Sequence, residues 1–186
     1  MSTSVVVEMF EFEATNRGSL HTLGLATCVR IAVTGSYSNG SRGNDRFLAH
    51  IAEQLTDDRS GYIGLQDYIY TIQDALSNGM EINEIVIVVP DVTRDAGYKP
   101  DKKKWQDEKE EQDEFNNAVI EEIEKNNFGE VKIAKHATDT SWELRINADK
   151  KIDFIDETED GAVYETYEEW KAYQSGSESD DEDDDE

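Results

Sequence analysis

The chain is poor in cysteine, proline and basic residues, and each shortage excludes a class of protein. Its 186 residues include one Cys, two Pro, 18 Lys+Arg and 43 Asp+Glu, so that the net charge is −25. A lone cysteine excludes an intramolecular disulfide framework and a multi-cysteine zinc site, and it fits a reducing compartment, which we expect to be the cytoplasm. So few basic residues argue against nucleic acid as a partner, because a row of phosphates would stay unneutralised.

Long hydrophobic runs and ligand motifs are also missing. No apolar run approaches the roughly 18 residues that a membrane span needs, so we expect no insertion into a membrane. Met1–Glu13 carries acidic side chains where a secretory signal would place basic ones, and we expect no such signal. Three scattered histidines and the single cysteine have no metal-ligand spacing, and the glycines form no phosphate-binding motif; we therefore expect neither a metal nor another cofactor.

Acidic charge is densest at the C-terminus. Residues Ser175–Glu186 hold eight acidic side chains, no basic ones and nothing apolar, which is typical of a disordered tail. Such a tail either keeps the protein soluble or docks a basic protein partner. We divide the chain into a folded domain at 1–156, an extension at 157–174 in which Tyr164–Tyr173 has the spacing of a short helix, and the tail at 175–186.

The hydrophobic pattern predicts an α+β fold. Period-two alternation and short apolar runs indicate strands, whereas apolar residues three and four apart indicate helices. Strands and helices do not alternate regularly, which disfavours a doubly wound sheet. The predicted strands are 5–13, 28–33, 47–51, 85–89, 130–135, 142–147 and 151–155, and the predicted helices are 63–77 and a second one around 115–123.

Cys28 and His50 are the residues whose placement indicates chemistry. Cys28 lies where a glycine-bearing loop, Leu23–Thr27, enters a predicted strand, and backbone N–H groups at such a point can face a substrate oxyanion. His50 lies on a strand that can run beside the strand from Cys28, and a cysteine nucleophile needs an adjacent imidazole because the thiolate is its reactive form. A lone cysteine is otherwise a small buried hydrophobe, so a packing role stays open. We expect His21 and His136 to be surface residues.

A family resemblance supports the chemical interpretation. The segment Thr22–Val29, read as TLGLATCV, resembles the signature of the CheD chemoreceptor glutamine deamidases, which carries Gly and Ser in place of Ala26 and Thr27. Ala49-His50-Ile51 is similar to the family's Ala-His-Val segment. The resemblance implies that Cys28 is the nucleophile, His50 the general base and Thr22 the residue that orients the imidazole, with Ala26 and Thr27 beside the substrate oxyanion.

The resemblance covers roughly residues 5–156 and implies two packed β-sheets flanked by helices, as in the catalytic domain of cytotoxic necrotizing factor toxins. It also implies a hydrolase that needs no cofactor and converts an accessible glutamine of a substrate protein to glutamate. The loop between Cys28 and His50 is longer than the family's, and Lys135–Thr140 replaces one of its glycine pairs, so chemoreceptors are not assumed as substrates. Two alternatives stay open: a non-catalytic CheD-like binding module that uses the acidic tail, and another cysteine hydrolase that acts on esters or isopeptides.

Overall fold

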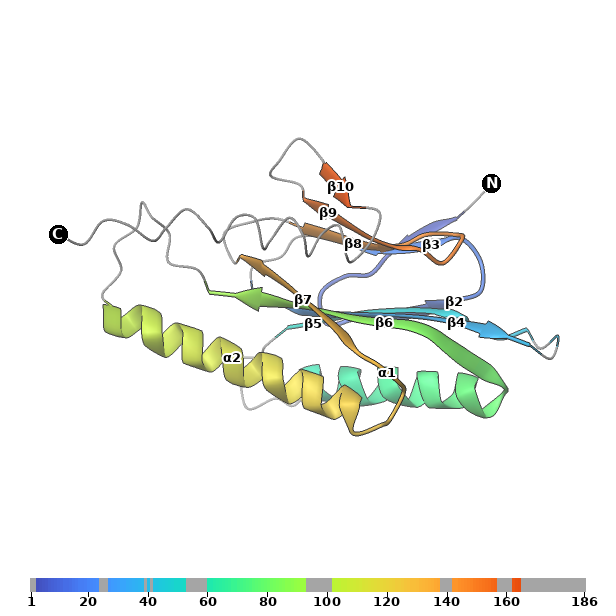
Figure 1. Cartoon of the computed structure of the whole chain (residues 1–186), viewed down its shortest axis with the longest axis horizontal. Coiled ribbons are helices and arrows are strands. Elements are labelled where there is room, and N and C mark those ends of the chain that lie inside the picture. The colour runs from blue at the N-terminus through green and yellow to red at the C-terminus, as the bar shows by residue number, and fades with distance from the viewer. Residues whose placement is uncertain are drawn as a thin grey trace.

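The computed structural model describes residues 3–23, 27–38, 40, 42–52, 60–92, 102–137, 142–156 and 162–164. Within these residues the chain forms two five-stranded β-sheets and two α-helices (Figure 1). The predicted α+β class, with two packed sheets flanked by helices, is confirmed.

The first sheet has the strand order β1-β3-β8-β9-β10. β1 and β3 are parallel, and the other neighbours in this sheet are antiparallel. The Asn147–Lys151 turn closes the β8–β9 hairpin through a hydrogen bond from Asn147 N to Lys151 O of 2.8 Å. The strands are β1 (Ser4–Val6), β3 (Ser19–Thr22), β8 (Trp142–Ile146), β9 (Ile152–Asp156) and β10 (Ala162–Tyr164).

The second sheet has the order β2-β5-β4-β6-β7. β4 lies at its centre, antiparallel to both β5 and β6, whereas β6 and β7 are parallel and are joined by a helical crossover. The central strands are buried on both faces, which explains why β6 contains the uninterrupted apolar run Ile85–Val89. The strands are β2 (Phe12–Thr15), β4 (Val29–Tyr37), β5 (Arg46–Ile51), β6 (Met80–Asp91) and β7 (Lys132–Ala137).

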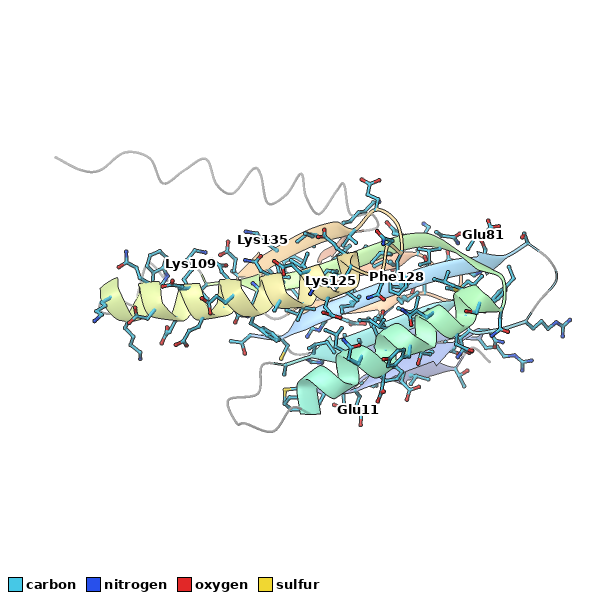
Figure 2. The ribbon with its side chains drawn as sticks, turned by 90° about the horizontal axis from the view of Figure 1, so that it is seen from below. Glu11, Glu81, Lys109, Lys125, Phe128 and Lys135 are labelled. Carbon is cyan, nitrogen blue, oxygen red and sulfur yellow. The ribbon has the colours of Figure 1, made fainter. Side chains whose placement is uncertain are left out.

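Helices α1 (Ser60–Ser77) and α2 (Lys102–Glu124) both cover the face of the second sheet that points away from the first (Figures 1 and 2). α1 ends at Asn78-Gly79, where Gly79 has a φ of 91° and donates its N–H to Leu76 O at 2.9 Å, as a C-terminal cap does. α2 begins earlier than the sequence predicted. The prediction missed its first turns because the residues before Phe115 are mostly acidic and basic and form no apolar stripe. Among the described residues, neither helix has the length and apolar character to cross a membrane.

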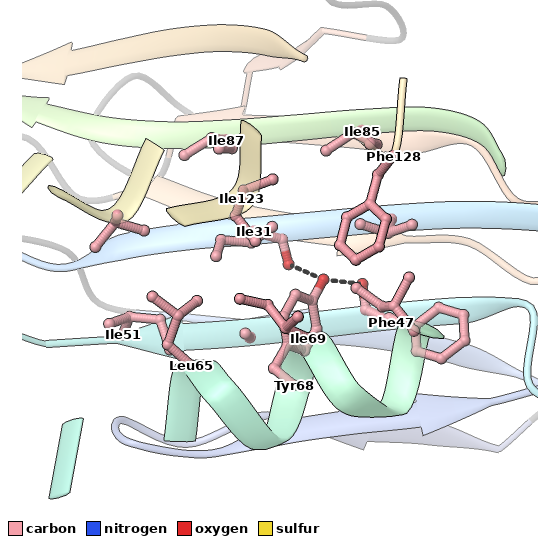
Figure 3. Close-up of a cluster of buried hydrophobic side chains, with 14 of the residues drawn as sticks. Ile31, Phe47, Ile51, Leu65, Tyr68, Ile69, Ile85, Ile87, Ile123 and Phe128 are labelled. Atoms are coloured by element: carbon pink, nitrogen blue, oxygen red, sulfur yellow. Dashed lines mark hydrogen bonds between the residues drawn. The ribbon is translucent and has the colours of Figure 1, made fainter. Parts of the chain in front are cut away.

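The interior consists of two layers on opposite faces of the second sheet. The helix–sheet layer holds Ile31, Ile87 and Tyr68 with their neighbours from both helices (Figure 3). The inter-sheet layer lies between the two sheets and includes Cys28 and Ala32 of the β4 segment. Alternation along β4 therefore sends successive side chains into different layers.

The N-terminal segment differs from the prediction of one strand over 5–13. It forms two strands that belong to different sheets, joined by a tight turn in which Glu11 N bonds to Glu8 O at 3.1 Å. Phe10 adopts a φ of 69°, a left-handed conformation that is unusual for a bulky residue. The backbone of this turn is attached to β5, because Phe10 N bonds to His50 O and His50 N bonds to Glu11 O, each at 2.9 Å.

Two C-terminal predictions fall largely beyond the part of the chain that the structure describes. The predicted helix at 164–173 lies outside it except for Tyr164, and the acidic tail at 175–186 lies outside it entirely. β10 pairs with β9 through Val163 and Ile155, so the first sheet continues past residue 156.

Candidate active site

A group of polar side chains is buried in the inter-sheet layer. Thr22 and Arg30 are 0% exposed, His136 is 1% exposed and His50 is 3% exposed, and Cys28 lies in the same layer at 6%. Polar groups are costly to bury without partners, so a concentration of them in one layer of a small domain requires an explanation.

The register of β4 and β5 brings two of these side chains, Arg30 and His50, to the face that carries Cys28. Arg30 pairs directly with His50, and Ala32 pairs with Leu48 two positions further along. Ala32 and Leu48 lie in the inter-sheet layer, so Arg30 and His50 also face the first sheet. Cys28 belongs to the same layer and lies immediately before β4, two residues ahead of Arg30.

Thr22 and His50 meet across the two sheets. Thr22 Oγ1, at the end of β3, lies 2.8 Å from His50 Nδ1, and both side chains are buried. We assign the proton to Nδ1, which then donates to the threonine oxygen and leaves Nε2 with its lone pair. His50 Nε2 is buried and has no hydrogen-bond partner among the described residues. The imidazole is therefore held by Thr22 at Nδ1, and its Nε2 is enclosed by the protein.

The electrostatics of the site favour an uncharged resting pair. Burial, assisted by the positive charge of Arg30, lowers the pKa of His50 to about 4, while the backbone of Val7 opposes the shift. Burial raises the pKa of the Cys28 thiol, against the opposing effects of Arg30 and of the Thr27 backbone. At neutral pH the site thus holds a thiol and a neutral imidazole. Since His50 Nε2 has no partner, no hydrogen bond to the Cys28 sulfur is present in this state.

Four of the five predicted site residues lie in the described part of the chain. The structure brings Thr22 into contact with His50 and puts Cys28 in the same layer, immediately before the adjoining strand β4. Thr27 is exposed, and its carbonyl accepts a hydrogen bond of 3.4 Å from Gln112 Nε2. Ala26 lies outside the described residues. The chemical roles assigned to these residues remain predictions.

Sequence reasoning missed two groups that border the site. The first is a pair of buried side chains on α2, Gln112 and Asn116, which are 4% and 5% exposed. Gln112 Nε2 donates to Asn116 Oδ1 at 3.1 Å, and Asn116 Nδ2 donates to Pro90 O at 2.8 Å. Their neighbours are so acidic that nothing in the sequence distinguishes them from exposed residues. The second is Arg30, which the sequence could have indicated because it is the only charged residue in the apolar run Cys28–Val33.

His136 was predicted to be a surface histidine, and this is wrong. β7 continues through Ala137, so His136 follows the buried Ala134 by two positions and points into the inter-sheet layer. Its Nδ1 donates to the Ala137 carbonyl at 2.9 Å, and its buried Nε2 has no partner among the described residues. His136 lies near Arg30, between Val88 of β6 and Leu144 of β8.

The burial of His136 predicts a pH-dependent stability. Burial is the main reason that its pKa falls from 6.5 to about 4, so below pH 6.5 the unfolded chain binds a proton that the folded chain does not. The contribution of the neutral His136 to the free energy of unfolding is therefore fully present above pH 6.5, and it decreases as the pH falls towards 4. Between pH 7 and pH 5 a His136→Leu variant should lose about 2 kcal/mol less unfolding free energy than the wild type, measured by urea denaturation. Equal losses in the two proteins would contradict a neutral, buried His136.

Comparison with known proteins adds no assignment. Neither the protein-family models nor the curated proteins contain a match to this chain. Among the described residues, no three His, Cys, Asp or Glu side chains are grouped as a metal site would require.

Proposed function

We propose that this protein is a cytoplasmic protein-glutamine deamidase of the CheD type, with Cys28 as nucleophile, His50 as general base and Thr22 as the residue that orients His50. The observation that carries the proposal is the buried 2.8 Å contact between Thr22 Oγ1 and His50 Nδ1. It joins residues 28 positions apart on different sheets, and these two residues and Cys28 are the ones that the family signature singles out.

The first half of the reaction forms a thioester. His50 Nε2 takes the proton of the Cys28 thiol as the sulfur adds to the carboxamide carbon of a substrate glutamine, and the carbonyl π electrons move to the oxygen. In this proposal the backbone N–H groups near Cys28 and Thr27 hold this oxyanion, as is typical of acyl transfer. The C–N bond then breaks, the charged imidazole gives its proton to the nitrogen, and ammonia leaves.

The second half returns the enzyme to its starting state. His50 Nε2 takes a proton from a water molecule whose oxygen adds to the thioester carbon. The C–S bond breaks, and the sulfur recovers a proton from the imidazole. Glutamine becomes glutamate, one water is consumed and one ammonia is released. A neutral imidazole at rest suits both halves, because each begins with His50 accepting a proton.

A non-catalytic binding module is the second candidate, and the burial of the thiol favours it. Cys28 is only 6% exposed, and burial raises its pKa away from the reactive thiolate form. In this case the protein would bind a basic protein partner through its acidic surface and tail without catalysing a reaction on it. The reaction of Cys28 with iodoacetamide separates the candidates, since a binding module has no need of a reactive thiol.

The test of the proposal is mass spectrometry of lysate proteins treated with the wild type or with Cys28→Ser. We expect specific glutamines to become glutamates only with the wild type, because a hydroxyl at this position is a far weaker nucleophile. Equal conversion by the two proteins would assign it to spontaneous deamidation, and no conversion would refute the deamidase. A reactive Cys28 without glutamine conversion would instead favour the hydrolysis of esters or isopeptides.

A further inference from the structure

We propose that Arg30 is an electrostatic positioning residue of the Cys28–His50 pair, a fixed positive charge between the sheets that adds to burial in disfavouring a proton on His50 and stabilises negative charge on the Cys28 sulfur. Its role in turnover rests on the proposed function, whereas its effect on the two side chains can be measured without a substrate.

The position of Arg30 follows from the strand register. It pairs with His50 on β5 and with Val88 on β6, and it follows Cys28 by two residues on its own segment. Cys28 and Val88 lie in the inter-sheet layer, so the arginine side chain enters this layer beside both members of the pair. Arg30 is 0% exposed and is among the largest fully buried side chains of the chain.

Hydrogen bonds to both sheets hold the guanidinium in place. Nη2 donates to Leu23 O at 3.2 Å, at the end of the strand that carries Thr22, and Nη1 donates to Trp142 O at 3.4 Å, at the start of β8. Both acceptors are backbone carbonyls of the first sheet or its continuation, so the charge cannot swing away without leaving partners unsatisfied. A guanidinium also stays protonated at any pH at which the protein is folded.

The charge acts in the same direction on both members of the pair. It offsets part of the rise that burial causes in the pKa of the Cys28 thiol, because it favours a thiolate, and it adds to the fall that burial causes in the pKa of His50, because it disfavours an imidazolium. A positive charge next to His50 thus makes the imidazole a weaker base but its conjugate acid a stronger proton donor. In the proposed reaction this favours release of the proton to departing ammonia, and the thiolate that leaves in the second half is stabilised.

The other charged and titratable groups around Arg30 do not reproduce this effect. Glu143 of β8 lies near Arg30, but its carboxylate is paired with Arg145 at 2.6 Å. His136 of β7 is neutral at pH 7, since burial lowers its pKa to about 4, and Asp91 at the end of β6 is bound to Lys109 at 2.7 Å. Among the described residues, Arg30 is the cation that alters the pKa of both Cys28 and His50.

The experiment measures the titration of His50 by NMR and the rate of Cys28 alkylation by iodoacetamide across pH. In the wild type His50 should titrate near pH 4. In Arg30→Met its pKa should rise, and alkylation at pH 7 should slow by about threefold to tenfold as the thiolate fraction falls. Arg30→Lys, which retains a positive charge, should lie between the wild type and Arg30→Met in both measurements.

Arg46→Met is the matched control. Arg46 is 5% exposed, starts the same strand β5 as His50, and pairs with Thr34, so that it faces the same layer at the other end of the sheet. It is bound to Asp45 at 3.1 Å and to Ala148 O at 2.7 Å. Its loss should lower stability but leave the titration of His50 and the alkylation of Cys28 unchanged.

Three results would overturn the inference. The first is a wild-type His50 that titrates near pH 6.5, which needs no variant to fold. The second is an unchanged His50 pKa in a folded Arg30→Met protein, and the third is an equal change in Arg46→Met. None of these measurements depends on glutamine turnover, so a failed deamidase assay with the expected titrations would refute the proposed function and leave the role of Arg30 intact.

Discussion

His50→Gln is expected to slow glutamine deamidation by about 10²–10⁴-fold, the range that a positioned general base contributes, and Cys28→Ala is expected to abolish it. Glutamine side chains are unactivated amides, so the thiol needs a base to become a nucleophile and an acid to expel ammonia. One imidazole performs both steps in the proposed mechanism. The measurement is the rate of Gln-to-Glu conversion by mass spectrometry on the first substrate identified.

Combining the substitutions gives a stricter test than either alone. Residues that act as a unit are strongly non-additive, so the Cys28→Ala/His50→Gln double variant should be no slower than Cys28→Ala. Thr22→Val should cost less, about tenfold, because it removes one hydrogen bond to Nδ1 and leaves both reacting groups in place.

The matched control for the histidine is His21→Gln. His21 is adjacent to Thr22 on β3, but its Nδ1 bonds to Ser4 Oγ at 3.0 Å, and it alternates away from the buried Thr22. Its substitution should leave the rate unchanged. A His50→Gln variant with wild-type activity, or a His21→Gln variant that is as slow as His50→Gln, would contradict the assignment of the base.

The elements that the sequence predicts best are those with a single dominant pattern. Ile85–Val89 has no polar interruption and is the buried part of β6, and the apolar spacing after Ile63 lies in α1. In both cases burial alone determines the pattern, so periodicity is sufficient to identify the element. The predicted strand Cys28–Val33 belongs to the same group, since β4, which begins one residue later at Val29, is covered on both faces.

Elements whose position depends on contacts distant in sequence could not be predicted. β3 is only Ser19–Thr22 and polar except for Leu20, and it exists because β1 and β8 supply hydrogen bonds on its two sides. The change of sheet between Val6 and Phe12 depends on a turn attached to β5, which the local sequence does not reveal. For the candidate site, the motif located Thr22, Cys28 and His50, but the structure was needed to find the charge of Arg30 between the sheets.

Tyr68→Ala is expected to lower the free energy of unfolding by about 3–5 kcal/mol, a large part of the stability of a small domain. Tyr68 is 0% exposed and packs its ring edge-to-face on Phe12, with centroids 5.8 Å apart. Its hydroxyl lies 3.0 Å from Ile31 O and 3.2 Å from Phe47 O, so that α1 is attached to both β4 and β5 (Figure 3). Burial raises the pKa of this hydroxyl well above 10, so it remains a donor at every pH of interest.

Two further tyrosine variants separate packing from hydrogen bonding. Tyr68→Phe keeps the ring and should cost only about 1–2 kcal/mol, because it leaves two buried carbonyls without their donor. Tyr70→Ala is the control on the same helix; Tyr70 is 61% exposed, and its loss should change stability by less than about 0.5 kcal/mol. Urea denaturation measures all three. A Tyr70→Ala variant as unstable as Tyr68→Ala would contradict the assignment of the loss to burial, because Ala is the better helix former and helix propensity cannot explain it.

The same variants test whether the two layers of the interior are independent. Tyr68 lies on the helix side of the second sheet, whereas His50 and Arg30 face the first sheet. Neighbouring residues on a strand alternate between these layers, so Tyr68→Phe removes a partner of the Phe47 and Ile31 carbonyls without touching the inter-sheet side chains. We therefore expect Tyr68→Phe to lower stability while His50 still titrates near pH 4. A shifted His50 titration in this variant would mean that the helix layer, and not Arg30 and burial alone, determines the charge of the imidazole.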